Sequence, residues 1–388
     1  MSYNSTNKVL YPSSIFRLEK HEIFPFERFA YCAMKIGADV LPPANLPNSI
    51  EISFDDSNSI FKYPWLVNAG IMQNIYGDGF KIITTSLTPV IIMAICHSIG
   101  LYLFNSDHDL DKFEFRKKVT DLGNNLNSLI NSYNNDGLQK SIRSLFDDIG
   151  LGIFNFSAPV LFFDLTTQFI VNHEIAHAYA GQLTSKHNYS EGENRAFEFI
   201  VDLVATEWLY NKMIRNTPDT EEYRNLRGVK NYSESIIENT MTTLDMQINT
   251  VLVFAFAGAI VNGGHFSLEG GISHPHPLSR YGLQMMHLTT LVLSNYKDIF
   301  SKEVETELGD RWTYYFSFLI ESGLISQNDI KAMASGTFYA DLKDAIGLIN
   351  THNILELKKV VPFLELILNE NANVNLMHIM LPKFRTVK

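Results

Sequence analysis

A helix that carries two histidines one turn apart is the feature that most constrains how this chain can fold. Residues 164–183 lack proline and place apolar side chains on one narrow stripe at about 100° per residue, which predicts an amphipathic helix that faces a core. His173 and His177 border this stripe, so their imidazoles project from the same side of the helix. The apolar members of the stripe are Leu165, Phe169, Ala176 and Ala180.

The two histidines enclose a glutamate in the pattern His-Glu-Ile-Ala-His, whose residue types suit a zinc site. Imidazoles at positions i and i+4 can bind one zinc ion, and a catalytic zinc site keeps a further position open for water. A carboxylate beside that water can take its proton when the water attacks a carbonyl. The pattern predicts Zn²⁺ bound by His173 and His177, with Glu174 as the general base. The alternative is a chance pattern that contains two unrelated buried histidines.

A second predicted helix, residues 195–210, offers the third ligand. Glu198 and Asp202 lie one turn apart on the same stripe of this helix. Burying two carboxylates among apolar side chains is costly unless a cation or a strong donor offsets their desolvation. We therefore expect Glu198 to bind the metal ion, and Asp202 to accept a hydrogen bond from a zinc-bound imidazole, His173 first. The alternative is that both acids lie on the solvent side of the helix.

Glu193 competes with Glu198 for the role of third ligand, because it also follows the histidine pattern. Ser190 and Glu193 have the spacing of a capping box, which predicts that the second helix begins there. On a continued helix, Glu193 and Glu207 both point away from the stripe that holds Glu198. The spacing favours a structural role for Glu193 and leaves the choice of ligand open.

Two elements of the sequence resemble the gluzincin metallopeptidases, in which a glutamate after the histidine motif is the third zinc ligand. The resemblance extends over about residues 165–285 and implies a zincin-like core that binds Zn²⁺ and hydrolyses peptide bonds. The two elements are His173-Glu174-x-x-His177 and Glu198-x-x-x-Asp202.

A third element, residues 273–280, is similar to the His-Pro-x-x-x-x-Arg segment of the HtpX and CAAX prenyl protease group within that clan. This resemblance implies that His274 lies near the active site and holds the developing oxyanion. It also implies that Arg280 organises the site or faces the substrate. The alternative is a proline-bounded turn before a helix that begins near Leu278.

The chain departs from those membrane proteases in two ways. Strong membrane spans are missing, and the interval between His177 and Glu198 is short, as in soluble thermolysin-like enzymes. An acidic chain with this motif is similar in kind to the soluble Lit-type peptidases, which cut a host translation factor during phage exclusion. It also resembles the ImmA-like proteases, because residues 193–199 are similar to their Glu-x-x-Ala-x-x-Phe. Under that alignment Glu193 becomes the ligand.

Composition excludes several classes of protein. A formal net charge of -11 opposes a phosphate-binding surface, so we expect no nucleic-acid partner. Cys32 and Cys96 are the only cysteines and form no C-x-x-C pattern, so neither a disulfide framework nor a cysteine metal site is expected. The first residues lack the basic start and apolar core of a secretory signal. These features predict a cytoplasmic protein.

One uncharged segment, residues 82–104, meets the length of a membrane span. Its threonines, serines, histidine and proline lower its hydrophobicity, which favours a buried core helix. Association with the inner membrane through this segment stays open as the alternative. A second apolar run, residues 251–261, is too short to cross a bilayer and precedes an Asn-Gly-Gly turn signal.

Three regions are predicted within a mainly α (α+β) fold. Residues 1–110 form an N-terminal region, whose first eighty residues contain many prolines among aromatic residues; this predicts irregular structure with short strands rather than long helices. Residues 111–298 are expected to form the metallopeptidase core, and residues 299–388 a helical C-terminal region. The stretch 363–375 resembles half of one ankyrin repeat, but no second copy follows, which favours an ordinary terminal helix.

The leading interpretation is a zinc metalloendopeptidase that acts on a protein or peptide substrate. An alternative from another class is a catalytically silent module, in which zinc stabilises helices that bind a partner. A structural zinc site is usually closed by four protein ligands, and this pattern supplies three. The number of protein ligands therefore favours an enzyme over a zinc-stabilised module. A membrane-anchored metalloprotease is the third possibility.

Overall fold

The structure is a computed structural model of the chain. It describes residues 8–11, 18–39, 49–55, 69–73, 79–85, 88–96, 157–180, 182, 188–216, 275, 279–280, 282–284, 286–287, 290–291, 338–352 and 355–370. This part of the chain is mainly helical and contains a small mixed sheet, which confirms the expected mainly α class. The chain divides into two compact units, which are described in turn.

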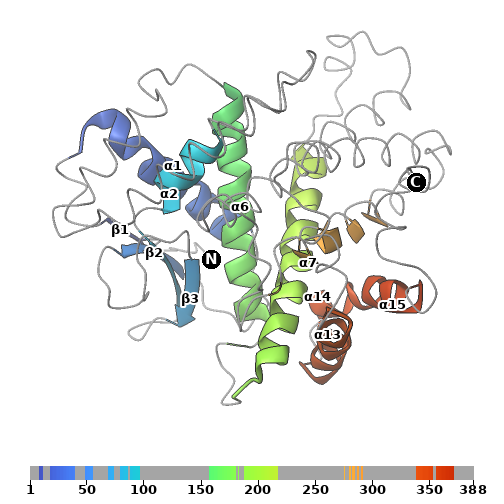
Figure 1. The fold of residues 1–388 in the computed structure, drawn as a ribbon. Helices are drawn as coiled ribbons and strands as arrows, with labels where there is room; N and C mark the ends of the chain where they lie inside the picture. The colour runs from blue at the N-terminus through green and yellow to red at the C-terminus, as the bar shows by residue number, and fades with distance from the viewer. Residues whose placement is uncertain are drawn as a thin grey trace, which may run out of the picture. The chain divides into compact units, whose positions relative to one another are not determined.

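The first unit contains a four-stranded sheet with the strand order β1-β2-β4-β3 (Figure 1). Strands β1, β2 and β4 are parallel, and β3 runs antiparallel to β4. Because β3 is the last strand in this order, it is an edge strand among the described strands. The strands are β1 (Lys8–Leu10), β2 (Ser49–Asp55), β3 (Ala69–Gln73) and β4 (Gly79–Thr85).

Residues 82–104 do not form the single core helix that the sequence predicted. The segment starts in β4 and continues into a separate helix, α2 (Thr88–Ile95). Four consecutive β-branched residues, from Ile82 to Thr85, favour extended backbone, and all four are buried. Pro89 suits the first turn of α2, where its missing N–H needs no partner. The expected burial of this segment is thus correct for its described residues, but the element type is wrong.

No helix among the described residues is long and apolar enough to cross a membrane. Residues 97–104, at the end of the uncharged segment, lie outside the described part of the chain, as does the second apolar run, residues 251–261.

Helix α1 (Lys20–Asp39) corrects the prediction that the proline-rich N-terminal region contains no long helix. At its start, the Glu22 carboxylate accepts a hydrogen bond of 2.7 Å from the backbone N–H three residues earlier. Pro25 lies inside the helix and costs about 3 kcal/mol. Burial of Phe26 and Phe29 contributes roughly 1.5–3 kcal/mol each, which offsets that cost.

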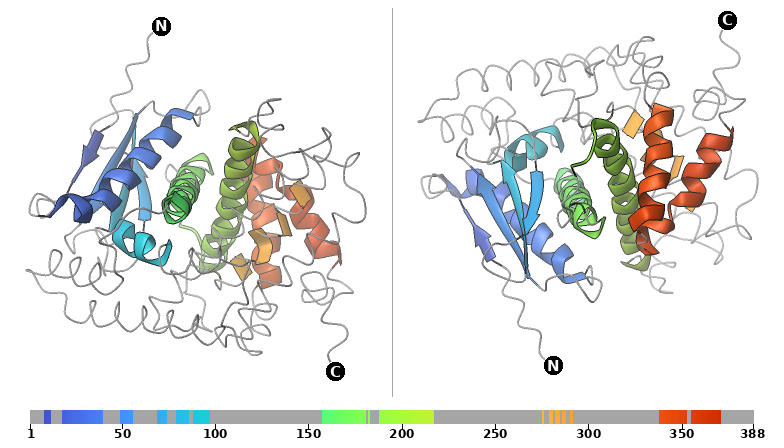
Figure 2. Two further views of the ribbon diagram at one scale, coloured as in Figure 1. Left: turned by 90° about the horizontal axis from the view of Figure 1, so that it is seen from above. Right: turned by 90° about the horizontal axis from the view of Figure 1, so that it is seen from below.

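Helix α6 (Ser157–Tyr179) contains most of the helix predicted for residues 164–183. It packs against α1, α2 and β3 within the first unit (Figures 1 and 2). The predicted apolar stripe is buried, which confirms the orientation expected from the spacing. Its members are Leu165, Phe169, Ala176 and Ala180.

An ion pair ties α6 to α1. Arg28 of α1 donates from Nε to Asp164 Oδ1 of α6 at 2.7 Å and also binds Oδ2 through Nη2. The Cys32 thiol lies 3.3 Å from the same Oδ1. Cys32 and Cys96 are both free, buried thiols, and burial raises the pKa of the Cys96 thiol.

The second unit is organised around helix α7 (Glu191–Asn216). The Ser190 N–H donates to Glu193 Oε2 at 2.7 Å, and the Glu193 N–H donates to Ser190 Oγ at 3.2 Å. This reciprocal pair confirms the predicted capping box. The helix predicted for residues 195–210 lies wholly within α7.

Three C-terminal helices belong to the same unit: α13 (Phe338–His352), α14 (Leu355–Lys358) and α15 (Val361–Glu370). Helix α13 lies alongside α7 and also contacts α15 (Figure 2). Arg195 of α7 binds both carboxylate oxygens of Asp341 of α13 at 2.9 Å. The described residues of the C-terminal region are thus helical, as expected, and α15 includes the first part of the ankyrin-like stretch.

His287 is a buried histidine in this second unit. Its ring packs 4.8 Å, between centroids, from Phe363 of α15, and its Nε2 lies 3.9 Å from Glu207 Oε2 of α7. Desolvation by burial lowers the pKa of His287 from 6.5 to about 3. The imidazole is therefore neutral in the folded protein at neutral pH.

Acidification is expected to destabilise the fold through His287. The unfolded chain takes up this proton near pH 6.5 and the folded chain only near pH 3, so stability is lost as the pH falls through that window. The full shift corresponds to at most about 5 kcal/mol. The melting temperatures of the wild type and of His287→Leu, measured between pH 7 and pH 4, test this loss of stability. A smaller loss of melting temperature is expected in the variant, and equal losses would contradict the assignment.

Candidate metal centre

Helix α6 brings the two motif histidines together. Their Nε2 atoms lie 3.1 Å apart, and their rings meet edge to face with centroids 4.7 Å apart. Two imidazole nitrogens bound to one zinc ion at about 2.0–2.1 Å in near-tetrahedral geometry lie roughly 3.1–3.4 Å apart. His173 is 7% exposed and His177 is the more exposed of the two. The pair therefore has the spacing of two ligands of one ion.

Gln182 supports His177 from just beyond the end of α6. The His177 Nδ1 lies 2.6 Å from Gln182 Oε1, which can only accept a hydrogen bond. The proton of a neutral His177 therefore belongs on Nδ1, and Nε2 keeps its lone pair for a metal ion. Sequence reasoning missed Gln182. Its position five residues after His177 offers no periodic signal, because the chain has left the helix there.

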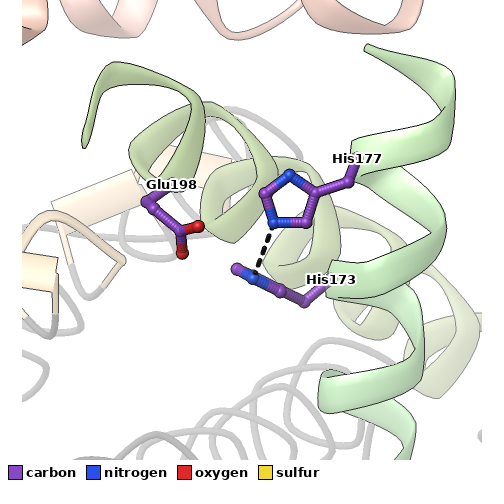
Figure 3. A group of neighbouring side chains, drawn as sticks. All are labelled: His173, His177 and Glu198. Atoms are coloured by element: carbon purple, nitrogen blue, oxygen red, sulfur yellow. Dashed lines mark hydrogen bonds between the residues drawn. The ribbon is translucent and has the colours of Figure 1, made fainter. Parts of the chain in front are cut away.

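Glu198, on the buried side of α7, completes a group of three ligands. One ligand atom from each of His173, His177 and Glu198 lies within 4.8 Å of the other two, and the trio is buried (Figure 3). Two imidazole nitrogens and one carboxylate oxygen form a donor set that fits zinc and also other divalent transition metals. The group could hold a metal ion. It is the only such group of three or more among the described residues.

Glu193, the competing candidate, has its carboxylate in the capping box at the start of α7. Glu207, which was expected to point away from the ligand stripe, lies near His287 instead. Of the carboxylates considered, the structure brings Glu198 to the histidine pair. This arrangement favours Glu198 over Glu193 as a third ligand.

Glu174, the expected general base, directly follows His173 and is 7% exposed. A carboxylate with so little access to water carries a desolvation cost that nearby donors or a cation must offset. A metal ion held by His173 and His177 would supply such a charge one residue away. The site thus combines three possible ligands with a buried acid beside them.

Asp202 and Arg280 form a bidentate ion pair. Arg280 Nε lies 2.6 Å from Asp202 Oδ2, and Arg280 Nη2 lies 2.7 Å from Oδ1. The same Nη2 is 3.3 Å from Glu198 Oε2, so the arginine contacts both acids of the predicted stripe. The expected hydrogen bond from a zinc-bound imidazole to Asp202 stays a prediction. His274, the expected oxyanion residue, lies outside the described residues. Ser279 and Arg280 are helical, which agrees with the alternative of a turn before a helix near Leu278.

Comparisons of the chain with protein-family models, with curated proteins and with solved structures find no match. The resemblance to gluzincins therefore rests on the motif residues alone. The geometry of the trio is independent of that resemblance.

Proposed function

We propose that this protein is a zinc-dependent metallopeptidase that hydrolyses internal peptide bonds of a protein substrate. The observation that carries the proposal is the buried trio of His173, His177 and Glu198, with the Glu174 carboxylate next to it in the chain. These residue types are those that metal-assisted hydrolysis needs: two imidazoles, one carboxylate ligand and a separate base.

The number of ligands supports an enzyme over a zinc-stabilised structural module. Structural zinc sites are usually closed by four protein ligands, whereas catalytic sites have three and an open position. The described residues supply three. A buried glutamate, Glu174, also directly follows the ligand His173, and a carboxylate beside the ligands is a group that water activation needs and a structural site does not.

Among the described strands, β3 lies at an edge of the sheet, and this position supports an extended peptide as the substrate. It packs against α6, the helix that carries the histidines, within the first unit. The outer side of an edge strand presents backbone N–H and C=O groups that can pair with another extended chain. A peptide bound there would lie beside the helix that holds His173 and Glu174. Smaller substrates would make no use of such an edge.

The roles of the side chains follow from their chemistry. His173 and His177 would hold the ion through Nε2, and Glu198 through a carboxylate oxygen. When bound, zinc would act as a Lewis acid on the scissile carbonyl and lower the pKa of water. Glu174 takes a proton from the attacking water and passes it to the departing amine nitrogen. One water is added across the C–N bond, which yields a carboxylate and an amine.

Zinc-dependent cleavage of a peptide library tests this function. The purified full-length protein, incubated with random decapeptides, should cut internal bonds that mass spectrometry can locate. Cleavage should stop with 1,10-phenanthroline and return when zinc is restored. Zinc bound in a 1:1 ratio without any hydrolysis of peptides or unfolded proteins would contradict the proposal and favour the silent zinc-stabilised module.

A further inference from the structure

Two acids and one arginine form a compact charge group in the second unit. Glu198 and Asp202 lie one turn apart on α7, and Arg280 contacts both of them. All three side chains have little access to solvent. Ionised, the group carries one net negative charge, because the guanidinium balances one of the two carboxylates.

The arginine divides its contacts unequally between the two acids. Nε and Nη2 both donate to Asp202, at 2.6 and 2.7 Å, in the planar fork that guanidinium and carboxylate groups prefer. Nη2 also approaches Glu198 Oε2, at an ion-pair distance of 3.3 Å that is longer than either contact with Asp202. The Arg280 guanidinium therefore binds Asp202 more strongly than it binds Glu198.

This division matters because a guanidinium and a metal ion compete for the same carboxylate. We propose that Asp202 is a positioning residue that acts through Arg280: it holds the guanidinium to itself and so keeps Glu198 available to the metal ion. Arg280 in turn provides the counter-charge that allows both acids to be buried before metal is bound. The inference rests on the proposed metal centre. It adds that Asp202 and Arg280 support the third ligand, Glu198.

A direct role for Asp202 would be different. If Asp202 acted by accepting a hydrogen bond from a zinc-bound imidazole, its contribution would not depend on Arg280. If it acts by occupying Arg280, its loss matters only while the arginine is present to capture Glu198. The two roles are therefore separated by removing Arg280 in the absence of the Asp202 charge.

Zinc affinity, measured by competition with a chromophoric chelator, is the quantity to compare. Asp202→Asn should weaken zinc binding by about 10- to 100-fold, the usual range for a residue that supports a ligand. The double variant Asp202→Asn/Arg280→Met should recover wild-type affinity to within about threefold. A loss that persists in the double variant would overturn the inference, and so would wild-type affinity in Asp202→Asn alone.

Asp341→Asn is the matched control. It makes the same substitution in a second buried bidentate pair among the described residues of this unit, Arg195–Asp341, which also involves α7. It should lower the melting temperature and change zinc affinity by less than about twofold, since it leaves the ligand acid untouched. A comparable loss of zinc in this control would show that weakened α7 packing, and not Arg280, explains the effect of Asp202→Asn, and would overturn the inference.

The ligand set of the double variant is checked by spectroscopy, and a second variant replaces it if it does not fold. The d–d absorption of the cobalt-substituted double variant should match that of the wild type, because the ligand set is unchanged. Arg280→Gln replaces Arg280→Met in the double variant if the Met variant does not fold. Absence of zinc binding in the wild type would refute the proposed metal centre itself, whereas zinc binding in the wild type without recovery in the double variant would refute only this inference.

Discussion

Glu174→Gln is expected to bind zinc like the wild type and to lose peptide hydrolysis by at least about 10²- to 10⁴-fold, the usual contribution of a general base. Glutamine keeps the size of the side chain but cannot accept the proton of the attacking water. The ligand trio of His173, His177 and Glu198 is unchanged by the substitution. Elemental analysis for zinc and kcat/KM on one peptide, measured for the same preparation, test both parts of the expectation.

Glu193→Gln is the control for this experiment. Glutamine at this position preserves the capping box, because its side-chain oxygen can still accept the bond from the Ser190 N–H. Zinc content and activity should both stay at the wild-type level. Cleavage by Glu174→Gln at the wild-type rate would disprove the role of Glu174, while loss of zinc from that variant would make its inactivity uninformative about the base.

Glu198→Ala is expected to lose zinc, with an affinity reduced by more than about 100-fold, since a ligand contributes more than the residues that support it. The fold should survive, because Arg280 keeps its bidentate partner Asp202 and no buried guanidinium is left without an anion. Metal content after dialysis against a zinc buffer, together with circular dichroism, measures both effects.

Glu193→Ala provides the comparison for that result. Loss of the capping box should lower stability by about 1 kcal/mol while zinc is retained. Loss of zinc from Glu193→Ala alone would instead select the ImmA-like ligand set. Retention of zinc in both variants would refute the proposed site.

Much of the candidate site could be predicted because its signals are local. The i, i+4 spacing of His173 and His177 needs only a helix, and the buried stripe of α6 follows from the same periodicity. The capping box of Ser190 and Glu193 likewise spans a single turn. Local signals also reduced the candidates for the third ligand to Glu198 and Glu193. The periodicity of the helix places Glu198 on the buried stripe, and the capping box places Glu193 on another side of the same helix.

Errors arose where packing outweighed local preference. Pro25 argued against a long helix, yet α1 forms because its apolar face is buried against the sheet and α6. The uncharged residues 82–104 had the length of a helix, but the β-branched run at their start pairs with β2 and β3. Length and charge alone do not distinguish a strand followed by a short helix from one long helix.

Periodicity within single helices was thus enough to predict two amphipathic helices, their buried faces and a short set of ligand candidates, because such patterns need no knowledge of distant residues. The partners of the polar side chains required the folded chain. Arg280 reaches Asp202 across 78 positions, and Arg28 reaches Asp164 across 136, and no local spacing encodes either pair. Only the structure groups a ligand atom of Glu198 with those of the two histidines, and only the structure shows that Arg280 binds Asp202 more closely than Glu198.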